Sequence, residues 1–367
     1  MQYRVLAGEL IPEVHFLEHK SDLVALVNKE DHSFSLAGAP IDHVKLKGFS
    51  AAVKAVGGFV PTPLTPNGPL CVQIRHVYTG KYPKGGFLKS DEQPMVLTSA
   101  LKDYATYAPA TRAVNFLTRV EAHKALTTPS ATEAGTPIVA YYPAVVADSL
   151  TLTLDMAFDG FDESLVAGIG NAFKDLGGLP IFATIGGYLI AGGSLIKLAG
   201  DTADRLIDGT PKFSQTVELN FRPENGPVIG ADLRVVCNNS FDPSGYRYDF
   251  GKGLISKTGD KVYDGDEPYI VLLIDGAERE SLKNFAPTAI TAAQLDKFFG
   301  AKPGAEVAID GLVGAMKLWN DFTYREQADA VAKKMADSSL SADQKKVLKD
   351  KFDALVKNIQ SDELKPK

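Results

Sequence analysis

Residues 176–196 contain no charged side chain, and this apolar run constrains the fold more than any other segment of the chain. It reads LGGLPIFATIGGYLIAGGSLI, and a charged sequence follows it. A helix of roughly 20 apolar residues crosses a bilayer core, so the run has sufficient length. Its six glycines each cost a helix about 1 kcal/mol relative to alanine, which indicates a need for close backbone approach.

We expect this run to belong to a helical hairpin that covers residues 163–208. The first helix spans Glu163–Lys174, and the second begins at Pro180, which suits the first position of a helix, and ends near Leu206. The hairpin is either buried between two sheet domains or enters a membrane after a trigger. The side chains expected to pack or to contact lipid are Ile181, Phe182, Ile185, Tyr188, Leu189, Leu195 and Ile196.

The overall composition is that of an ordinary globular protein, with 45% apolar and 23% charged residues. The formal net charge is −6 and no stripe of lysine and arginine is present, which argues against nucleic acid as a partner. The first residues lack the basic region and long apolar core of a signal peptide, so we expect a cytoplasmic protein, with leaderless export left open. Cys71 and Cys237 are expected to stay reduced and buried.

The segments on either side of the central run alternate apolar and polar residues, as half-buried strands do. Leu150, Leu152 and Leu154 alternate with threonines, for example. Together with frequent turn residues, this pattern favours β-sandwiches over an α/β fold. The predicted fold class is mostly β, with two β-sandwich-like lobes, a central apolar helical hairpin and a C-terminal helical tail. The predicted domains are residues 1–160, 161–210, 211–309 and 310–367.

The C-terminal tail is predicted to be helical from residue 310 to residue 362. Ser341 and Gln344 form a capping-box pattern before an amphipathic helix. A packing cluster is expected where the tail docks, and its members are Trp319, Phe322 and Tyr324.

A faint internal repeat relates the two lobes. The sequence VQIRHV, which begins at Val72, parallels ADLRVV, which begins at Ala231. Likewise DEQPMVL, which begins at Asp91, parallels DEPYIVL, which begins at Asp266. Duplication of one domain would leave such matches, and chance similarity between strand-rich segments also explains them.

The amino-terminal histidines form one candidate metal site. His15 and His19 are four residues apart, a helical spacing that can bind zinc, and His32, His43 and His76 could complete the site. The glutamate between the first two is misplaced relative to HExxH, and scattered histidines explain the pattern as well.

Acidic residues cluster at two further places, where oxygen ligands could hold calcium. Neither cluster has the EF-hand spacing, and acidic turns or helix N-termini also explain both. The candidate calcium ligands are Asp155, Asp159, Asp162, Asp264 and Asp266.

No catalytic motif stands out, because neither G-x-S-x-G nor a P-loop occurs in the sequence. Cys71 and His76 lie five apart on one predicted strand and are expected to point to opposite faces, which argues against a nucleophile–base pair. We therefore predict no catalytic residue and no bound metal, and identify no small-molecule substrate.

These observations favour a non-enzymatic interaction or scaffold protein that binds a protein partner, with the hairpin as its packed centre. The alternative is a membrane-active effector, pore-forming or lipid-binding, whose segment 163–208 inserts into a bilayer. A third hypothesis is a metal-dependent hydrolase that uses the amino-terminal histidines.

Overall fold

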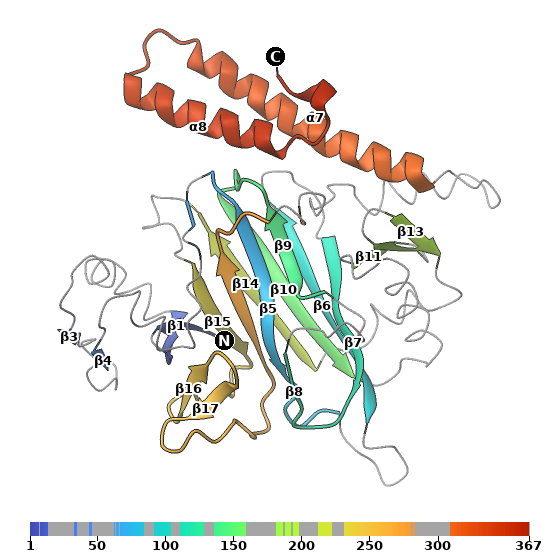
Figure 1. Ribbon diagram of the computed structural model, residues 1–367, viewed down its shortest axis with the longest axis vertical. Coiled ribbons are helices and arrows are strands. Elements are labelled where there is room, and N and C mark those ends of the chain that lie inside the picture. The colour runs from blue at the N-terminus through green and yellow to red at the C-terminus, as the bar shows by residue number, and fades with distance from the viewer. Residues whose placement is uncertain are drawn as a thin grey trace.

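The computed structural model describes most of the strands and the C-terminal helices of the chain, and Figure 1 labels their elements. The described residues are 1–6, 8–13, 33–34, 44–45, 62, 64–65, 67–83, 92–103, 111–127, 136–158, 181–185, 188–191, 194–197, 212–221, 231–279, 282 and 309–366.

Within this part of the chain, strands dominate and form two large sheets, which confirms the prediction of a mostly β protein (Figure 1). A nine-stranded sheet has the order β17–β16–β2–β1–β15–β18–β5–β8, and β9 also pairs with β5. Its strands are β1 (Gln2–Leu6), β2 (Glu9–Pro12), β5 (Leu70–Tyr78), β8 (Ala125–Leu126), β9 (Ile138–Tyr142), β15 (Asp232–Cys237), β16 (Tyr246–Asp249), β17 (Gly253–Ser256) and β18 (Tyr269–Asp275).

A seven-stranded sheet has the order β13–β12–β11–β7–β6–β10–β14. Its strands are β6 (Gln93–Asp103), β7 (Thr111–Val120), β10 (Ser149–Phe158), β11 (Ile181–Ile185), β12 (Tyr188–Ala191), β13 (Ser194–Lys197) and β14 (Phe213–Asn220). Two short strands, β3 (Ser33–Phe34) and β4 (Val44–Lys45), pair with each other.

The main hydrophobic core lies between the two sheets. The alternating leucines of β10 point inward, as their period of two predicts, and lie beside Val217 and Leu219 of β14. They share one buried cluster with Leu70, Val72 and Leu272 of the nine-stranded sheet. The two sheets therefore pack face to face as a sandwich.

A second core covers the outer face of the nine-stranded sheet, the face that points away from the seven-stranded sheet. The β16–β17 ribbon folds back across this face, so that Tyr248 and Leu254 share a buried cluster with Tyr269 and Leu273. All seven residues of β18 are buried as a result. An antiparallel sheet often leaves one face in water, but here both faces of its central strands are covered.

Strands from both halves of the chain occur in each large sheet. β14 pairs with β10, while β15 and β18 pair with β1 and β5. The segments 1–160 and 211–309 therefore share hydrogen-bonded sheets, rather than each forming a sandwich of its own. The repeat is not reproduced in the pairing either, since β15 and β18 are neighbours whereas β5 and β6 lie in different sheets.

The predicted central helix from Pro180 is wrong where the structure describes the chain. Residues 181–197 contain β11, β12 and β13, which form an antiparallel meander at the edge of the seven-stranded sheet. Ile185 pairs with Tyr188, and Ala191 pairs with Ser194, so a two-residue Gly-Gly step connects each pair of strands. Gly-Gly is a favoured two-residue hairpin loop, because both positions can adopt positive φ. The first predicted helix, Glu163–Lys174, lies outside the described residues.

The C-terminal tail is helical, as predicted, and consists of α7 (Ile309–Met335) and α8 (Ala342–Asn358), which pack against each other, followed by the short 3-10 helix η3 (Asp362–Leu364). The predicted capping box is present, with the Ser341 hydroxyl accepting from the Gln344 backbone and the Gln344 side chain accepting from the Ser341 backbone. The helix pair lies across one end of the two sheets (Figure 1). No helix in the described ranges is both long and apolar enough to cross a membrane.

Candidate functional site

A β-bulge in β5 gives the outer face of the nine-stranded sheet two adjacent polar side chains. His76 pairs with Val271 of β18 and Ile74 pairs with Leu272, so Arg75 is the extra residue between them. A bulge interrupts the alternation of a strand and redirects its side chains. Both Arg75 and His76 consequently contact residues of the β16–β17 ribbon.

His76 is buried, and its imidazole is neutral at pH 7. Its Nδ1 lies 3.1 Å from the hydroxyl oxygen of Tyr248, and the two rings meet edge to face. Burial, helped by the charge of Arg75, lowers the pKa of His76 to about 4, against an opposing effect of Asp249. Burial also raises the pKa of Tyr248 above its ordinary value. This pair therefore has neither a strong base nor an acidic phenol at neutral pH.

Arg75 is half-buried and lies over an aromatic ring. Its guanidinium carbon is 4.7 Å from the centroid of Phe250, in the turn between β16 and β17. The buried Nε atom has no hydrogen-bond partner. A buried donor without a partner costs free energy.

Tyrosines form the centre of the outer core. The rings of Tyr78 and Tyr269 stack with centroids 5.4 Å apart, and Tyr263 meets Tyr78 edge to face at 5.1 Å. A side chain at Gly253, where φ is +81°, would bring its Cβ to 2.7 Å from the Tyr269 hydroxyl. Burial raises the pKa of Tyr263 and Tyr269 to about 12, so these phenols stay protonated at neutral pH.

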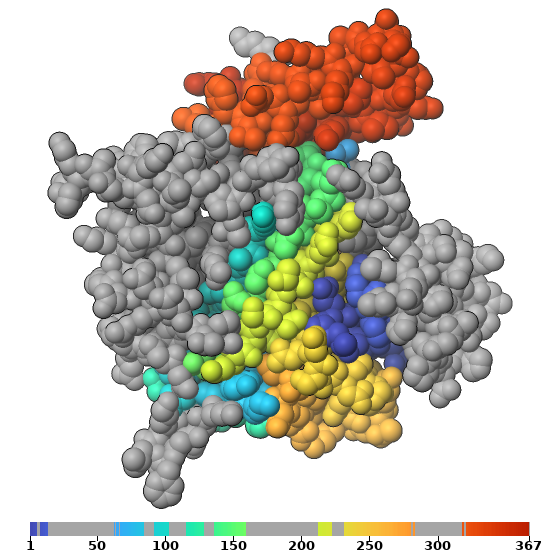
Figure 2. Space-filling model, turned by 180° about the vertical axis from the view of Figure 1, so that it is seen from behind, coloured from blue at the N-terminus to red at the C-terminus, as the bar shows by residue number. Residues whose placement is uncertain are grey.

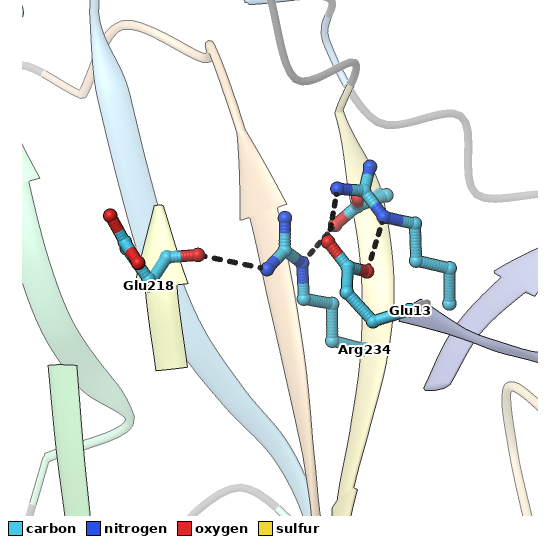
Figure 3. A network of polar contacts seen from close by, with 5 residues as sticks. Glu13, Glu218 and Arg234 are labelled. Atoms are coloured by element: carbon cyan, nitrogen blue, oxygen red, sulfur yellow. Dashed lines mark hydrogen bonds and ion pairs between the residues drawn. The ribbon is translucent and has the colours of Figure 1, made fainter. Parts of the chain in front are cut away.

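A buried network of four charged side chains closes the seam between the two sheets (Figure 3). Arg4 of β1 and Arg234 of β15 are directly opposite each other in register. Asp232 contacts both guanidinium groups, at 2.8 Å and 3.3 Å, while Glu13 pairs with Arg4 at 2.7 Å. The two positive and two negative charges balance, which buried ions require.

The same network reaches the free edge of β14. Arg234 Nη1 donates to the backbone carbonyl of Glu218 at 3.4 Å, and the Gln2 amide donates to that of Thr216 at 3.0 Å. Figure 2 shows this seam from behind, where the yellow-green β14 lies beside the dark blue β1. Side chains rather than a strand ladder thus satisfy these edge carbonyls.

A third polar group surrounds Cys71 at the other end of the outer face. With its amide oriented toward Arg279, Gln73 accepts from Nη2 at 2.7 Å, and Arg279 Nη2 also donates to buried Asp275 at 3.2 Å. Burial raises the pKa of the Cys71 thiol, which keeps it protonated and weakly nucleophilic.

The prediction that Cys71 and His76 face opposite ways is wrong. Cys71 pairs with Asp275, and His76 pairs with Val271 on the same face of β18. The bulge at Arg75 shifts the alternation by one residue, which no spacing rule for a regular strand includes. The two side chains still do not form a pair, because His76 contacts Tyr248 instead.

The seven residues predicted to pack or to contact lipid lie in the meander. Ile181, Phe182 and Ile185 belong to β11, Tyr188 and Leu189 to β12, and Leu195 and Ile196 to β13. These residues therefore belong to strands rather than to one face of a helix.

The candidate calcium ligands do not form one group among the described residues. Asp155 lies on the outer face of the seven-stranded sheet and accepts from the Ser214 hydroxyl at 2.7 Å. Asp264 and Asp266 lie between β17 and β18 of the nine-stranded sheet. Asp264 pairs with Lys261, and the backbone carbonyl of Asp266 accepts from the Lys81 backbone. The described ranges contain no group of three or more His, Cys, Asp or Glu side chains placed to hold a metal ion. Asp159 and Asp162 lie outside those ranges.

The two described histidines have different hydrogen-bond partners. His76 contacts Tyr248, whereas His123 Nδ1 lies 3.0 Å from the Tyr78 hydroxyl oxygen. The remaining members of the predicted metal site, His15, His19, His32 and His43, lie outside the described residues.

Sequence reasoning missed the Arg75 bulge and the Arg4–Arg234 network. Both depend on pairing between segments that are more than 190 residues apart, since β5 meets β18 and β1 meets β15. A usable signal existed only for the network, because Arg4 interrupts the apolar sequence YRVL and Arg234 interrupts DLRVVC. A charged residue inside an apolar strand predicts a buried ion pair.

Because His76 is buried, we expect the free energy of unfolding to fall in acid. Because the folded-state pKa is about 4 and the ordinary value is 6.5, the unfolded chain takes up a proton first as pH falls. The contribution of His76 is therefore complete above pH 6.5 and is lost between pH 6.5 and 4, by up to roughly 3 kcal/mol. Urea unfolding of the wild type and of His76→Gln at several pH values measures this, and an equal pH dependence in both proteins would contradict it.

No family model, curated protein or solved structure matches this chain, so its own residues must support any functional proposal.

Proposed function

We propose that this protein is a non-enzymatic interaction protein, in which the sandwich is a rigid support and the helix pair α7–α8 contacts a protein partner. One observation carries the proposal. The described residues include five exposed large apolar side chains, and three of them lie on this helix pair: Leu318, Phe322 and Val347, which are 50%, 63% and 66% exposed.

Leu318 and Phe322 are four residues apart, so they lie on the same side of α7. Of the predicted packing cluster, Tyr324 is buried in the helix-pair core, whereas the prediction for Phe322 is wrong because it is exposed; the side chain of Trp319 lies outside the described residues. Single exposed apolar residues are common on proteins, but adjacent ones on a helix are typical of contact surfaces.

The helix pair is held in a fixed orientation on the sandwich. The buried Asn358 side chain accepts from the Ala144 backbone at 3.1 Å and donates to its carbonyl at 2.8 Å. Within the tail, Asp321 of α7 accepts from the backbones of Gln360 and Ser361, at 2.9 Å and 2.8 Å, which joins α7 to the segment after α8. A surface presented rigidly loses less conformational entropy on binding than a mobile one.

The state of the buried polar groups supports binding rather than catalysis. His76 is neutral, and burial raises the pKa of Cys237 to about 12. The charged network of Arg4, Asp232 and Arg234 is balanced internally. Catalytic groups normally have pKa values tuned toward neutral pH, and these shifts go the other way.

Photo-crosslinking tests the proposed surface. A benzophenone amino acid in place of Phe322 is expected to form one discrete adduct in an extract of the source cells. Excess unlabelled wild-type protein should abolish the adduct, whereas the variant Leu318→Glu, Phe322→Glu should not compete. A benzophenone at Thr258, in an exposed turn far along the chain, is the matched control.

The proposal fails if position 322 gives no adduct above position 258, or if the glutamate variant competes as well as the wild type. Parallel samples with calcium and with a chelator test the calcium hypothesis. The membrane hypothesis in its helical form receives no support, because the described centre of its inserting segment is β11–β13.

A further inference from the structure

Arg75 is a cation without a counter-ion in the described part of the chain. Its Nε atom is buried and has no hydrogen-bond partner, and its guanidinium lies over the Phe250 ring. Five other arginines in the described part of the chain are paired with carboxylates. They are Arg4 with Glu13 and Asp232, Arg234 with Asp232, Arg247 with Asp260, Arg279 with Asp275 and Arg325 with Asp329.

The fold holds this guanidinium in place before any ligand binds. The bulge in β5 directs Arg75 to the outer face of the nine-stranded sheet, and Phe250 supports it at 4.7 Å. The Phe250 ring covers one face of the guanidinium and the Nε atom is buried, so the two Nη atoms remain for hydrogen bonding. The planar edge of arginine matches the two oxygens of a carboxylate or phosphate group.

We propose that Arg75, supported by Phe250 at the β5 bulge, binds the oxyanion group of a small ligand, which is a carboxylate or a phosphate. The site is separate from the helix-pair surface, so neither proposal depends on the other. The bound oxyanion would supply a negative charge beside this half-buried arginine. Buried ions are stable when they are paired in this way.

The charges of the groups around Arg75 are compatible with a bound anion. Asp249 is the nearby acid, but its Oδ1 already accepts from the backbones of Gly251 and Lys252, both at 2.9 Å. Lys252 is exposed in the same turn and adds a second positive charge. His76 is neutral at pH 7, since its pKa is about 4.

His76 also provides a spectroscopic reporter. The charge of Arg75 contributes to the low pKa of His76. An anion bound to Arg75 would offset that charge, so the midpoint of the His76 titration should rise when the ligand is present. In Arg75→Gln the midpoint should already be higher and should respond only at higher anion concentrations.

The experiment titrates the full-length protein with sodium phosphate, sodium acetate or sodium chloride at constant ionic strength, and follows the imidazole signals of His76 by NMR. Phosphate, acetate or both should give a saturable shift that chloride does not, and the salt that binds identifies the oxyanion class. Arg75→Gln should weaken binding about 10-fold or more, the effect of losing a charge-assisted hydrogen bond. Arg247→Gln, a matched loss of one positive charge in β16, should change it by less than about twofold.

Phe250→Leu provides a second variant, which keeps the charge of Arg75 and removes the ring beneath it. It should also weaken binding, and it serves alone if Arg75→Gln does not fold. The proposal is overturned if neither phosphate nor acetate gives a saturable response beyond chloride. It is equally overturned if Arg247→Gln weakens binding as much as Arg75→Gln, because the effect is then general charge attraction.

Discussion

Replacement of Asp232 by alanine is expected to lower the free energy of unfolding by about 3–5 kcal/mol. Asp232 contacts both Arg4 and Arg234, which lie directly opposite each other on neighbouring strands. Without it, two like charges meet at that position, and Arg234, which is 0% exposed, keeps only the Glu218 carbonyl. Removing one member of a buried ion network costs far more than the network itself contributes, because an uncompensated charge remains in the interior.

Urea unfolding at pH 7 measures this loss, and Asp353→Ala is the matched control. Asp353 pairs with Lys349 on the surface of α8, and such exposed helical pairs contribute roughly 0.5 kcal/mol or less. The double variant Asp232→Ala, Arg234→Met should recover part of the loss, because Arg4 still pairs with Glu13. A loss for Asp232→Ala no larger than that of the control would show that water reaches the network.

Leu272→Ala and Leu273→Ala should both destabilise the protein, each by about 2–5 kcal/mol. The two leucines are adjacent on β18 and therefore point to opposite faces of the nine-stranded sheet. Leu272 belongs to the core between the sheets, and Leu273 belongs to the outer core beneath the β16–β17 ribbon. In a sandwich with a solvated outer face, only one of the two substitutions would have a large effect.

Equilibrium unfolding of the two variants tests whether both cores are packed. Val347→Ala on α8, which removes an exposed apolar side chain, should change stability by less than about 0.5 kcal/mol. If Leu273→Ala behaves like Val347→Ala while Leu272→Ala is strongly destabilised, the outer core does not exist as described.

Patterns that depend on near neighbours in the sequence predicted their elements correctly. The alternation of Leu150, Leu152 and Leu154 identified β10 and its buried face, and the Ser341–Gln344 pair identified the start of α8. Both are local, because a strand alternates with a period of two and a capping box closes within one helical turn. Such signals need no knowledge of the partner segment.

The central run was misread because two local signals compete there. Twenty-one uncharged residues suggested a helix by length, whereas two Gly-Gly pairs separated by only four residues, Tyr188–Ala191, indicate hairpins. The observed pairing of Ile185 with Tyr188 and of Ala191 with Ser194 follows the second signal. Giving weight to glycine spacing rather than to total hydrophobicity would have predicted the meander.

The candidate anion site could not be predicted from spacing. Arg75 and His76 are adjacent in sequence, and in a regular strand they would point to opposite faces. Only the register of β5 against β18 shows the extra residue, and only the fold-back of the β16–β17 ribbon brings Phe250 to Arg75. Whether an arginine has a counter-ion is likewise settled by segments distant in the chain.

Where one local pattern dominates, as in β10 and α8, the sequence by itself determined the type of element and its apolar side, because these follow from residue order over a few positions. The tertiary structure decided which strands share a sheet, that both faces of β18 are buried, and that Arg4 and Arg234 meet while Arg75 has no carboxylate partner among the described residues. The reason is physical: burial and charge pairing are properties of contacts between distant segments, and many pairings of the same strands satisfy one local pattern.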